Sequence, residues 1–203
     1  MKLAAIILAA GRSSRFEDGH KLLVEIGGVP IIAHVCAALA QSKIDDIVLV
    51  TAGRDDAVAR AAGSGRWRQV EIPDFTGGLS TSLRAGLASV SQTADGVLVA
   101  LGDMPGITSG LVDTLIAAFE TDPGAIVFPA MSDGRRGHPI IWPKALFPAL
   151  QAVSGDSGGR TILAEHRNLW HPVTWDEPGA FTDIDTRADL QTYIGEVQPT
   201  RRK

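Results

Sequence analysis

The chain lacks several features that define large classes of protein. Its 203 residues include a single cysteine, Cys36, so no disulfide can form within the chain and a reducing compartment is expected. A formal net charge of −4 is the opposite of the basic footprint of a general nucleic-acid-binding protein. The apolar run near the N-terminus is too short to span a bilayer and has no small-residue cleavage site of a signal peptide. These absences favour a cytoplasmic protein that binds neither nucleic acid nor membrane.

Two familiar phosphate-binding signatures and a zinc motif are also missing. The run Leu3–Ala10 has the length of one buried strand and ends in a small, polar loop that closes on Lys21. This loop contains neither G-x-G-x-x-G nor a final Gly-Lys-Ser/Thr, so neither a Rossmann dinucleotide site nor a P-loop is favoured. The histidines show no metal-ligand spacing. A strand that ends in such a loop still predicts an anion-binding site at the carboxyl edge of an open α/β sheet.

Strand-like and helix-like segments alternate along the first 129 residues. Buried strands are predicted at Leu3–Ala10, Ile47–Val50, Val70–Ile72, Val97–Leu101 and Ala125–Phe128. Helices are predicted to begin at Pro30, to cover Arg54–Ala62, to follow Ser80 as N-cap and to start at Thr108 or Ser109. Cys36 falls on the apolar face of the first helix, which indicates a core residue rather than a nucleophile. The alternation predicts a Rossmann-like α/β fold, a mainly parallel sheet with helices on both faces.

The pattern is less regular after Pro129. A polar turn at Met131–Gly137 and an apolar strand at Pro139–Trp142 predict a small antiparallel addition to the sheet in the C-terminal half. Helices are predicted over Asp156–His166 and Thr186–Ile194, on either side of a short strand at Val173–Trp175. No internal repeat or low-complexity linker divides the chain, and its length fits one domain over residues 1–203.

Six short motifs follow one another along the chain. They are LAAGRSSR at Leu8–Arg15, GLSTSLRAGL at Gly78–Leu87, LGDMP at Leu101–Pro105, GHP at Gly137–Pro139, GDSGGR at Gly155–Arg160 and DIDTRADL at Asp183–Leu190. In this order they resemble the MobA-like NTP transferase family, and most closely its branch of MocA-type molybdenum cofactor cytidylyltransferases. The resemblance covers nearly the whole chain and implies a fold like that of the nucleotide-diphospho-sugar transferases.

The resemblance also implies an activity. It indicates a Mg²⁺-dependent enzyme, with Mn²⁺ as an alternative metal, that transfers CMP from CTP to the phosphate of molybdopterin and releases pyrophosphate. Residues 1–129 would bind the nucleotide and residues 130–195 the acceptor, while residues 196–203 would form a short basic tail. A molybdoenzyme or chaperone would receive the product. Two alternatives stay open. One is transfer of GMP or another nucleotide to molybdopterin, a sugar phosphate or another small phosphorylated acceptor; the other is a non-enzymatic nucleotide- or cofactor-binding protein.

The loop after the first strand supplies the residues expected around the triphosphate. Both reactants are anions, so positive charge and in-line positioning matter more than a covalent nucleophile. Backbone N–H groups of Gly11–Ser14 are expected to cradle the phosphates, while Arg15 and Lys21 neutralise their charge. The predicted nucleotide-binding residues are Leu8, Ala9, Ala10, Gly11, Arg12, Ser13, Ser14, Lys21, Gly78, Ser80, Ser82 and Asp103. Of these, Lys21 and Asp103 are also predicted to be catalytic, together with Arg15.

Some of these assignments keep a second interpretation. Arg12 suits a phosphate contact and a solvated loop cation equally, and Ser80 and Ser82 suit either the edge of a base or a helix cap. Arg15 and Lys21 are six positions apart, one more than in the commoner family loop, and the glycine between them, Gly19, can absorb the extra residue.

Two carboxylates are the candidate metal ligands. Asp103 follows a buried strand, with Gly102 before it to allow close approach, and Mg²⁺ prefers few carboxylates together with phosphate oxygens and water. The resemblance implies Asp185 as the second ligand. Asp183 is the alternate, because residues two apart in a strand point to the same face. Capping of the last helix by Asp185 or Thr186 is the structural alternative.

The acceptor half offers three candidate binding residues. The GHP match implies that His138 contacts the acceptor, whereas a lone histidine in an apolar strand is more often structural. Asp156 and Arg160 suit acceptor contacts and helix capping equally. The resemblance also implies a preference for CTP over GTP, because LAAG goes with the cytidylyl branch, whereas guanylyl relatives more often read LAGG. Ala10 is expected to leave less room beside the base than Gly would.

Overall fold

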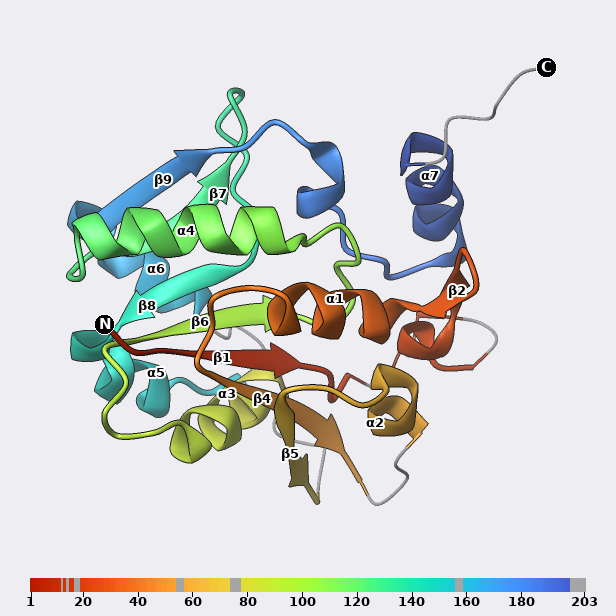
Figure 1. Ribbon diagram of the computed structural model, residues 1–203, viewed down its shortest axis with the longest axis horizontal. Coiled ribbons are helices and arrows are strands. Elements are labelled where there is room, and N and C mark those ends of the chain that lie inside the picture. Colours follow the sequence, from red (N-terminus) through yellow and green to blue (C-terminus); the bar gives the residue numbers. More distant parts are fainter. Residues whose placement is uncertain are drawn as a thin grey trace.

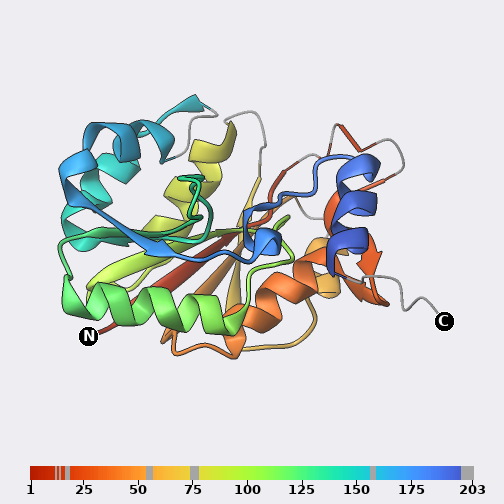
Figure 2. The same ribbon diagram turned by 90° about the horizontal axis from the view of Figure 1, so that it is seen from above.

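A seven-stranded, mainly parallel sheet forms the centre of the protein, with helices on both of its faces (Figures 1 and 2). The computed structural model describes residues 1–11, 13, 15–16, 19–53, 57–73, 78–155 and 159–197. The strands of this sheet are β1 (Leu3–Leu8), β4 (Asp46–Ala52), β5 (Trp67–Ile72), β6 (Gly96–Leu101), β7 (Ile126–Ala130), β8 (Ile140–Pro143) and β9 (Trp170–Thr174). The α-helices are α1 (Ile31–Ala40), α2 (Ala57–Ala62), α3 (Gly78–Ser89), α4 (Ser109–Thr121), α5 (Phe147–Ala152), α6 (Arg160–Glu165) and α7 (Arg187–Val197). The predicted fold class is confirmed.

Burial of the sheet on both faces explains the continuous apolar runs of its central strands. In β1, Leu3, Ala5 and Ile7 belong to the core on one face, together with residues of α1, α4 and α7. Ala4 and Ile6 belong to the core on the other face, with residues of α3, α5 and α6. Successive side chains of a strand point to opposite faces, so a strand that is covered on both sides has no position for a polar residue.

The direction in which strands are added reverses next to β1. The strand order is β5-β4-β1-β6-β8-β7-β9, so the chain moves from β1 outward to β4 and β5 and then returns to the other side of β1 as β6. Both neighbours are parallel to β1: Leu8 pairs with Val50 of β4 and with Leu101 of β6. The carboxyl ends of β1 and β6 therefore border the crevice in which open α/β sheets bind ligands.

The antiparallel strand β8 lies between β6 and β7. Its first residue, Ile140, pairs with Val99 near the carboxyl end of β6, and Ile141 pairs with Val127 of β7. Because β8 runs against β6, the residues just before β8 lie beside the carboxyl end of β6. This is the predicted antiparallel addition, and it brings the C-terminal half to the same edge of the sheet as the loops after β1 and β6.

Some short features differ from what the sequence predicts. A separate antiparallel hairpin of β2 (Glu25–Ile26) and β3 (Val29–Pro30) was not expected. Gly27 and Gly28 connect it with φ values of 63° and 82°, which glycine adopts readily in a two-residue turn. The N-cap prediction for Ser80 is wrong: α3 already begins at Gly78, and Ser80 lies buried within its first turn.

Other elements appear where they are predicted, with shifted ends. Thr108 caps α4, since its hydroxyl accepts the N–H of Leu111 at 3.2 Å. The strands β4, β5 and β9 begin earlier than predicted, at Asp46, Trp67 and Trp170. Residues 54–56 and 156–158, at the predicted starts of two helices, lie outside the described residues. The short helix α5 was not predicted, because a six-residue segment that contains a proline has no clear helical period.

The structure bears on two predictions from the sequence, that Cys36 is a core residue and that the N-terminal apolar run does not span a membrane. Cys36 is fully buried in α1, and burial raises the pKa of its thiol to about 12. A thiol with such a pKa supplies almost no thiolate at neutral pH, which agrees with a core role. Over the described residues, no helix combines the length and the apolar character needed to cross a membrane.

A close backbone contact provides a test of how the loop after β6 is held. A Cβ placed on Gly106 would lie 2.0 Å from the carbonyl oxygen of Gly179, whereas a Cβ on Gly110 in α4 meets only Thr108, at 3.9 Å. We expect Gly106→Ala to destabilise the protein by roughly 2–3 kcal/mol, because the backbone must shift. Gly110→Ala is the matched control and should be neutral or stabilising. Urea unfolding of both variants measures the difference, and equal stabilities would contradict the close contact.

Candidate active site

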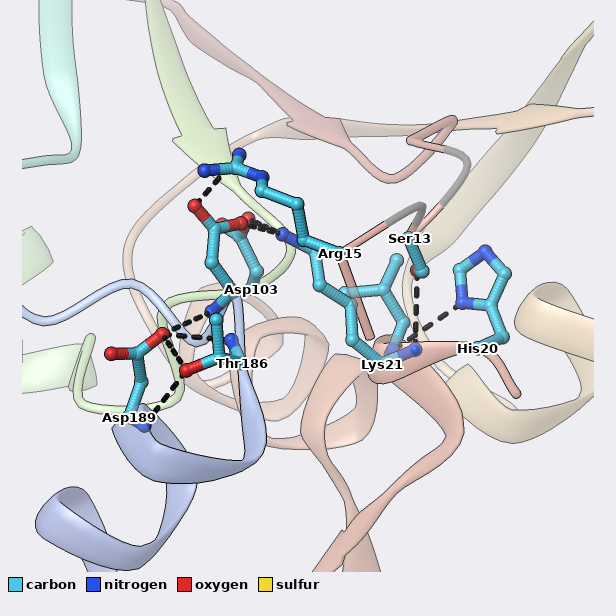
Figure 3. Close-up of polar contacts among 9 residues, drawn as sticks. Ser13, Arg15, His20, Lys21, Asp103, Thr186 and Asp189 are labelled. Atoms are coloured by element: carbon cyan, nitrogen blue, oxygen red, sulfur yellow. Dashed lines mark hydrogen bonds and ion pairs between the residues drawn. The ribbon is translucent and has the colours of Figure 1, made fainter. Parts of the chain in front are cut away.

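The ammonium group of Lys21 lies between two carboxylates that come from distant parts of the chain (Figure 3). Its Nζ donates to Asp103 Oδ2 at 2.5 Å and to Asp185 Oδ1 at 2.6 Å. The Lys21 side chain is 11% exposed, and both carboxylates are 19% exposed. Arg15, 72% exposed, pairs with the other oxygen of Asp185 at 2.8 Å. The structure therefore brings together the predicted residues Arg15, Lys21, Asp103 and Asp185 in one charge cluster.

Asp103 is positioned by the end of β6. The N–H of Gly102 donates to the carbonyl oxygen of Leu8 at 2.9 Å, so the loop packs directly on the end of β1. A Cβ on Gly102 would lie 3.1 Å from that same oxygen, which agrees with the predicted need for close approach. The carbonyl oxygen of Asp103 accepts the N–H of Ile184 at 2.9 Å. This bond brings the segment that contains Asp185 to the same place.

The helix α7 begins directly after Asp185 and Thr186. The cap is formed by Thr186, whose Oγ1 accepts the N–H of Asp189 at 3.2 Å, while Asp189 Oδ2 accepts the N–H of Thr186 at 2.7 Å (Figure 3). This reciprocal arrangement is a capping box. Thr186 therefore acts as a helix cap, as one interpretation of the sequence predicts, and the Asp185 carboxylate pairs with Lys21 and Arg15.

Hydrogen bonds close the loop that leads to Lys21. Ser13, with φ 53°, accepts the N–H of Lys21 on its Oγ at 3.1 Å. His20 caps the short 3₁₀-helix Lys21–Leu23, because its Nδ1 accepts the N–H of Leu22 at 3.3 Å (Figure 3). Gly19 has φ 97°, a conformation that glycine adopts without strain. His20 was missed from the sequence, although it directly precedes Lys21.

The electrostatics of the cluster favour the positively charged form of Lys21. Burial disfavours the charged form of Lys21, but the two carboxylates outweigh that effect and raise the pKa of the ammonium group. Asp103 Oδ1 is buried and has no hydrogen-bond partner among the described residues. An orphaned carboxylate oxygen is costly unless another ligand satisfies it. Oxygen ligands from two carboxylates suit Mg²⁺ or Mn²⁺. The described part of the chain contains no group of three or more His, Cys, Asp or Glu side chains that could hold a metal ion.

A cavity of about 540 Å³ opens at the same edge of the sheet. It extends from Leu8 and Leu101, at the ends of β1 and β6, to the turn before β8. Its polar lining residues are Arg135, Arg136, His138, Arg160 and Asp183, and its aromatic ones are Trp142 and Phe181. Burial lowers the pKa of His138, and the nearby carboxylates of Asp103 and Asp183 do not reverse the shift. The imidazole is therefore neutral at pH 7.

The remaining predicted residues divide among three groups. His138 and Arg160 line the cavity as expected for an acceptor site, and Asp183 lies there too rather than against Lys21. Ser80 and Ser82 are buried residues of α3, and their contact with a base stays a prediction. Arg12, Ser14 and Asp156 lie outside the described residues. Arg135 and Arg136 were not predicted as site residues, although two arginines directly before the GHP motif are a visible signal.

Comparison with known proteins identifies a matching family and relatives that cover most of the chain. The profile of the MobA-like NTP transferase domain matches residues 5–169. A molybdenum cofactor guanylyltransferase of Cupriavidus metallidurans is 31% identical, over 96% of this chain and 95% of that protein. A nicotine blue oxidoreductase of Paenarthrobacter nicotinovorans is 29% identical, over 91% of this chain and 92% of that protein. The crystal structure of Rv0371c of Mycobacterium tuberculosis H37Rv in complex with manganese has a TM-score of 0.80 and 25% identity, over 96% of this chain and 98% of that one.

The cap of α7 has a testable pH dependence. Hydrogen bonds from Thr186 lower the pKa of Asp189. A carboxyl whose pKa is lower in the folded state stabilises the fold above its unfolded value of about 3.9, and this stabilisation is lost as the pH falls through the folded value. We expect Asp189→Ala to cost about 1 kcal/mol at pH 7 and progressively less below about pH 4. Urea unfolding from pH 3 to 7 measures this, with Glu196→Ala in the same helix as the control. A cost that does not change with pH would contradict the cap.

Proposed function

Because the chain belongs to the MobA-like NTP transferase family, a family of nucleotidyltransferases, we propose that it transfers CMP from CTP to the phosphate of a molybdopterin-type acceptor. The observation that carries the proposal is the Lys21 ammonium between Asp103 and Asp185, at the carboxyl ends of β1 and β6. A relative that is 31% identical over nearly the whole chain is named molybdenum cofactor guanylyltransferase, which supports this class of acceptor.

The reaction requires charge neutralisation at one phosphorus atom. A phosphate oxygen of the acceptor attacks the α-phosphorus of CTP, the bond to the β-phosphate oxygen breaks, and pyrophosphate leaves. Lys21 supplies a fixed positive charge, because it is nearly buried and held by two hydrogen bonds. Arg15 supplies a second positive charge on a side chain that is mostly exposed. Fixed charge of this kind needs little reorganisation during the reaction.

Asp103 and Asp185 are the residues that would hold a divalent cation. The unpartnered, buried Oδ1 of Asp103 fits such a ligand, and both side chains offer only oxygen. A bound Mg²⁺ would supply Lewis-acid stabilisation of the phosphate charge. A solved protein that is 25% identical is described as a complex with manganese, which supports a divalent metal in this fold family.

The cavity beside the charge cluster would bind the acceptor. His138 and Arg160 line it, and Trp142 and Phe181 give it aromatic walls that suit a flat ring. Because β8 runs antiparallel to β6, His138 lies near the carboxyl end of β6. Asp103 comes shortly after that same end of the strand. An acceptor in the cavity can therefore present its phosphate to the charge cluster. The recipient of the product would be a molybdoenzyme or its chaperone.

The preference for CTP rests on the first motif. Ala10 is 2% exposed and packs in the core on the α3 face, whereas its neighbour Ala9 packs on the α1 face. A methyl group at position 10 leaves less space on the α3 side of the nucleotide loop than glycine would. The named molybdenum cofactor relative is a guanylyltransferase, so GTP is the alternative nucleotide.

The metal assignment is tested by removing charge from each carboxylate. We expect Asp103→Asn and Asp185→Asn each to lower the rate by at least about 100-fold, roughly 3 kcal/mol, while the protein stays folded. The double variant should lose much less than the sum, because residues that hold one ion are not additive. Pyrophosphate release across a Mg²⁺ titration is the measurement, and Asp183→Asn, at the alternate ligand, is the comparison variant.

Two outcomes of that experiment would count against the assignment. Near-wild-type turnover by Asp103→Asn would refute the mechanism. Fully additive losses would remove Asp185 from the metal site, and a strong loss in the Asp183 variant would then identify the alternate ligand.

The nucleotide preference is tested by kcat/KM for CTP and GTP with molybdopterin. We expect the wild type to favour CTP by about tenfold or more, and Ala10→Gly to shift the ratio toward GTP. Ala9→Gly removes the same methyl group on the opposite face and should leave the ratio unchanged. A wild-type preference for GTP would overturn the cytidylyl assignment and leave the transferase class intact.

A further inference from the structure

The turn before β8 is a rigid wall of the cavity. Its backbone is closed by a bridge between Ala130 and Arg136 and by the N–H of Met131, which donates to the carbonyl oxygen of Arg135 at 2.8 Å. Ser132 is tied to Asp176, because its N–H and its hydroxyl both donate to that carboxylate, at 2.9 Å. In Figure 1 this turn extends from β7 beside β9, away from the ends of β1 and β6. Gly134, Arg135 and Arg136 of this turn line the cavity, whereas Lys21 is not among its lining residues.

Three arginines line this cavity, and they differ in what holds them. Arg135 is neutralised by Asp133, with Nε and Oδ2 2.8 Å apart. Arg160 stands at the start of α6, close enough to His138 to affect its charge. Arg136 forms no ion pair within the described residues; its guanidinium carbon lies instead 4.7 Å from the centre of the Trp170 ring. Arg136 is thus a cation held by an aromatic ring and not by a carboxylate.

Trp170 is itself firmly placed. Its indole N–H donates to the carbonyl oxygen of Leu163 at 2.8 Å, and its ring meets Phe128 edge to face at 5.6 Å. A guanidinium that stacks on an indole face keeps its N–H donors in its own plane, where oxygen atoms can accept them. Such an arginine is weakly hydrated and pre-organised for recognition of oxygen-bearing groups.

We propose that Arg136 is a specificity-determining residue that donates hydrogen bonds to an oxygen-bearing group on the ring end of the acceptor, with Trp170 as its positioning residue. This inference rests on the proposed function, because it takes the cavity to be the acceptor site. Most of the other residues that line the cavity are apolar or aromatic, with Leu83, Trp142 and Phe181 among them. The ligand class is therefore a flat ring with a carbonyl or carboxylate group, whose phosphate-bearing arm reaches toward Lys21.

A direct binding experiment tests this with the full chain and pterin-6-carboxylate as the probe, followed by its fluorescence anisotropy. Arg136→Ala should weaken binding about tenfold or more, since a charge-assisted hydrogen bond is lost. Arg167→Ala is the matched control: Arg167 stacks on the same ring at 5.3 Å but does not line the cavity, and binding should stay within about twofold of wild type.

Trp170→Leu separates positioning from direct contact. It should weaken probe binding less than Arg136→Ala does, and it should add nothing in the Arg136→Ala background, because both act through one guanidinium. In turnover assays Arg136→Ala should raise the KM for molybdopterin, with the KM for CTP unchanged and kcat little changed. A purely structural role of the turn would instead change both KM values and kcat.

The outcomes for the two proposals are distinguishable. Equal affinity of the Arg136 and Arg167 variants for the probe, or no binding by the wild type, would overturn the inference. Turnover of molybdopterin with an unchanged KM in Arg136→Ala would also overturn it and leave the proposed function intact. Weakened probe binding in Arg136→Ala, with no pyrophosphate release from any nucleotide and molybdopterin, would support the inference and refute the proposed function.

Discussion

The sharing of one buried ammonium group by two carboxylates is the interaction on which the site depends. Lys21 is 82 residues from Asp103 and 164 from Asp185, so the contact forms only when the sheet and the C-terminal segment are in place. A buried charge without partners costs several kcal/mol, roughly, and the fold avoids that cost by bringing both carboxylates to it. The same grouping concentrates fixed charge where a triphosphate and a metal would meet.

Strand direction explains how one sheet edge gathers residues from both halves of the chain. The loops after β1 and β6 reach this edge because both strands are parallel, and they contribute Lys21 and Asp103. The antiparallel strand β8 reaches it from the other end, so the segment before β8 contributes His138 and the arginine-bearing turn. An all-parallel sheet would place the residues before β8 at the opposite edge. The single reversed strand therefore sets the proposed acceptor cavity beside the charge cluster.

The sequence predicts those parts of the structure that local pattern determines. Apolar runs covered on both faces identify the central strands, and the motif order places Asp103 and Asp185. The β2–β3 hairpin was missed because two-residue strands have no period, although Gly27 and Gly28 are a turn signal. Arg136 was missed because a polar turn is typical of solvent exposure. Only tertiary packing, with Trp170 from a distant strand, makes it part of a cavity wall.

The central claim, transfer of a nucleotidyl group to a phosphorylated acceptor, is tested most directly by following the label of each phosphate. Wild-type protein would be incubated with Mg²⁺, molybdopterin and CTP labelled at the α- or the γ-phosphorus. The account predicts that the α label moves to the acceptor, that the γ label appears in pyrophosphate, and that dephosphorylated acceptor is inert. Transfer of the γ label to the acceptor, or consumption of CTP without any labelled acceptor, would contradict it.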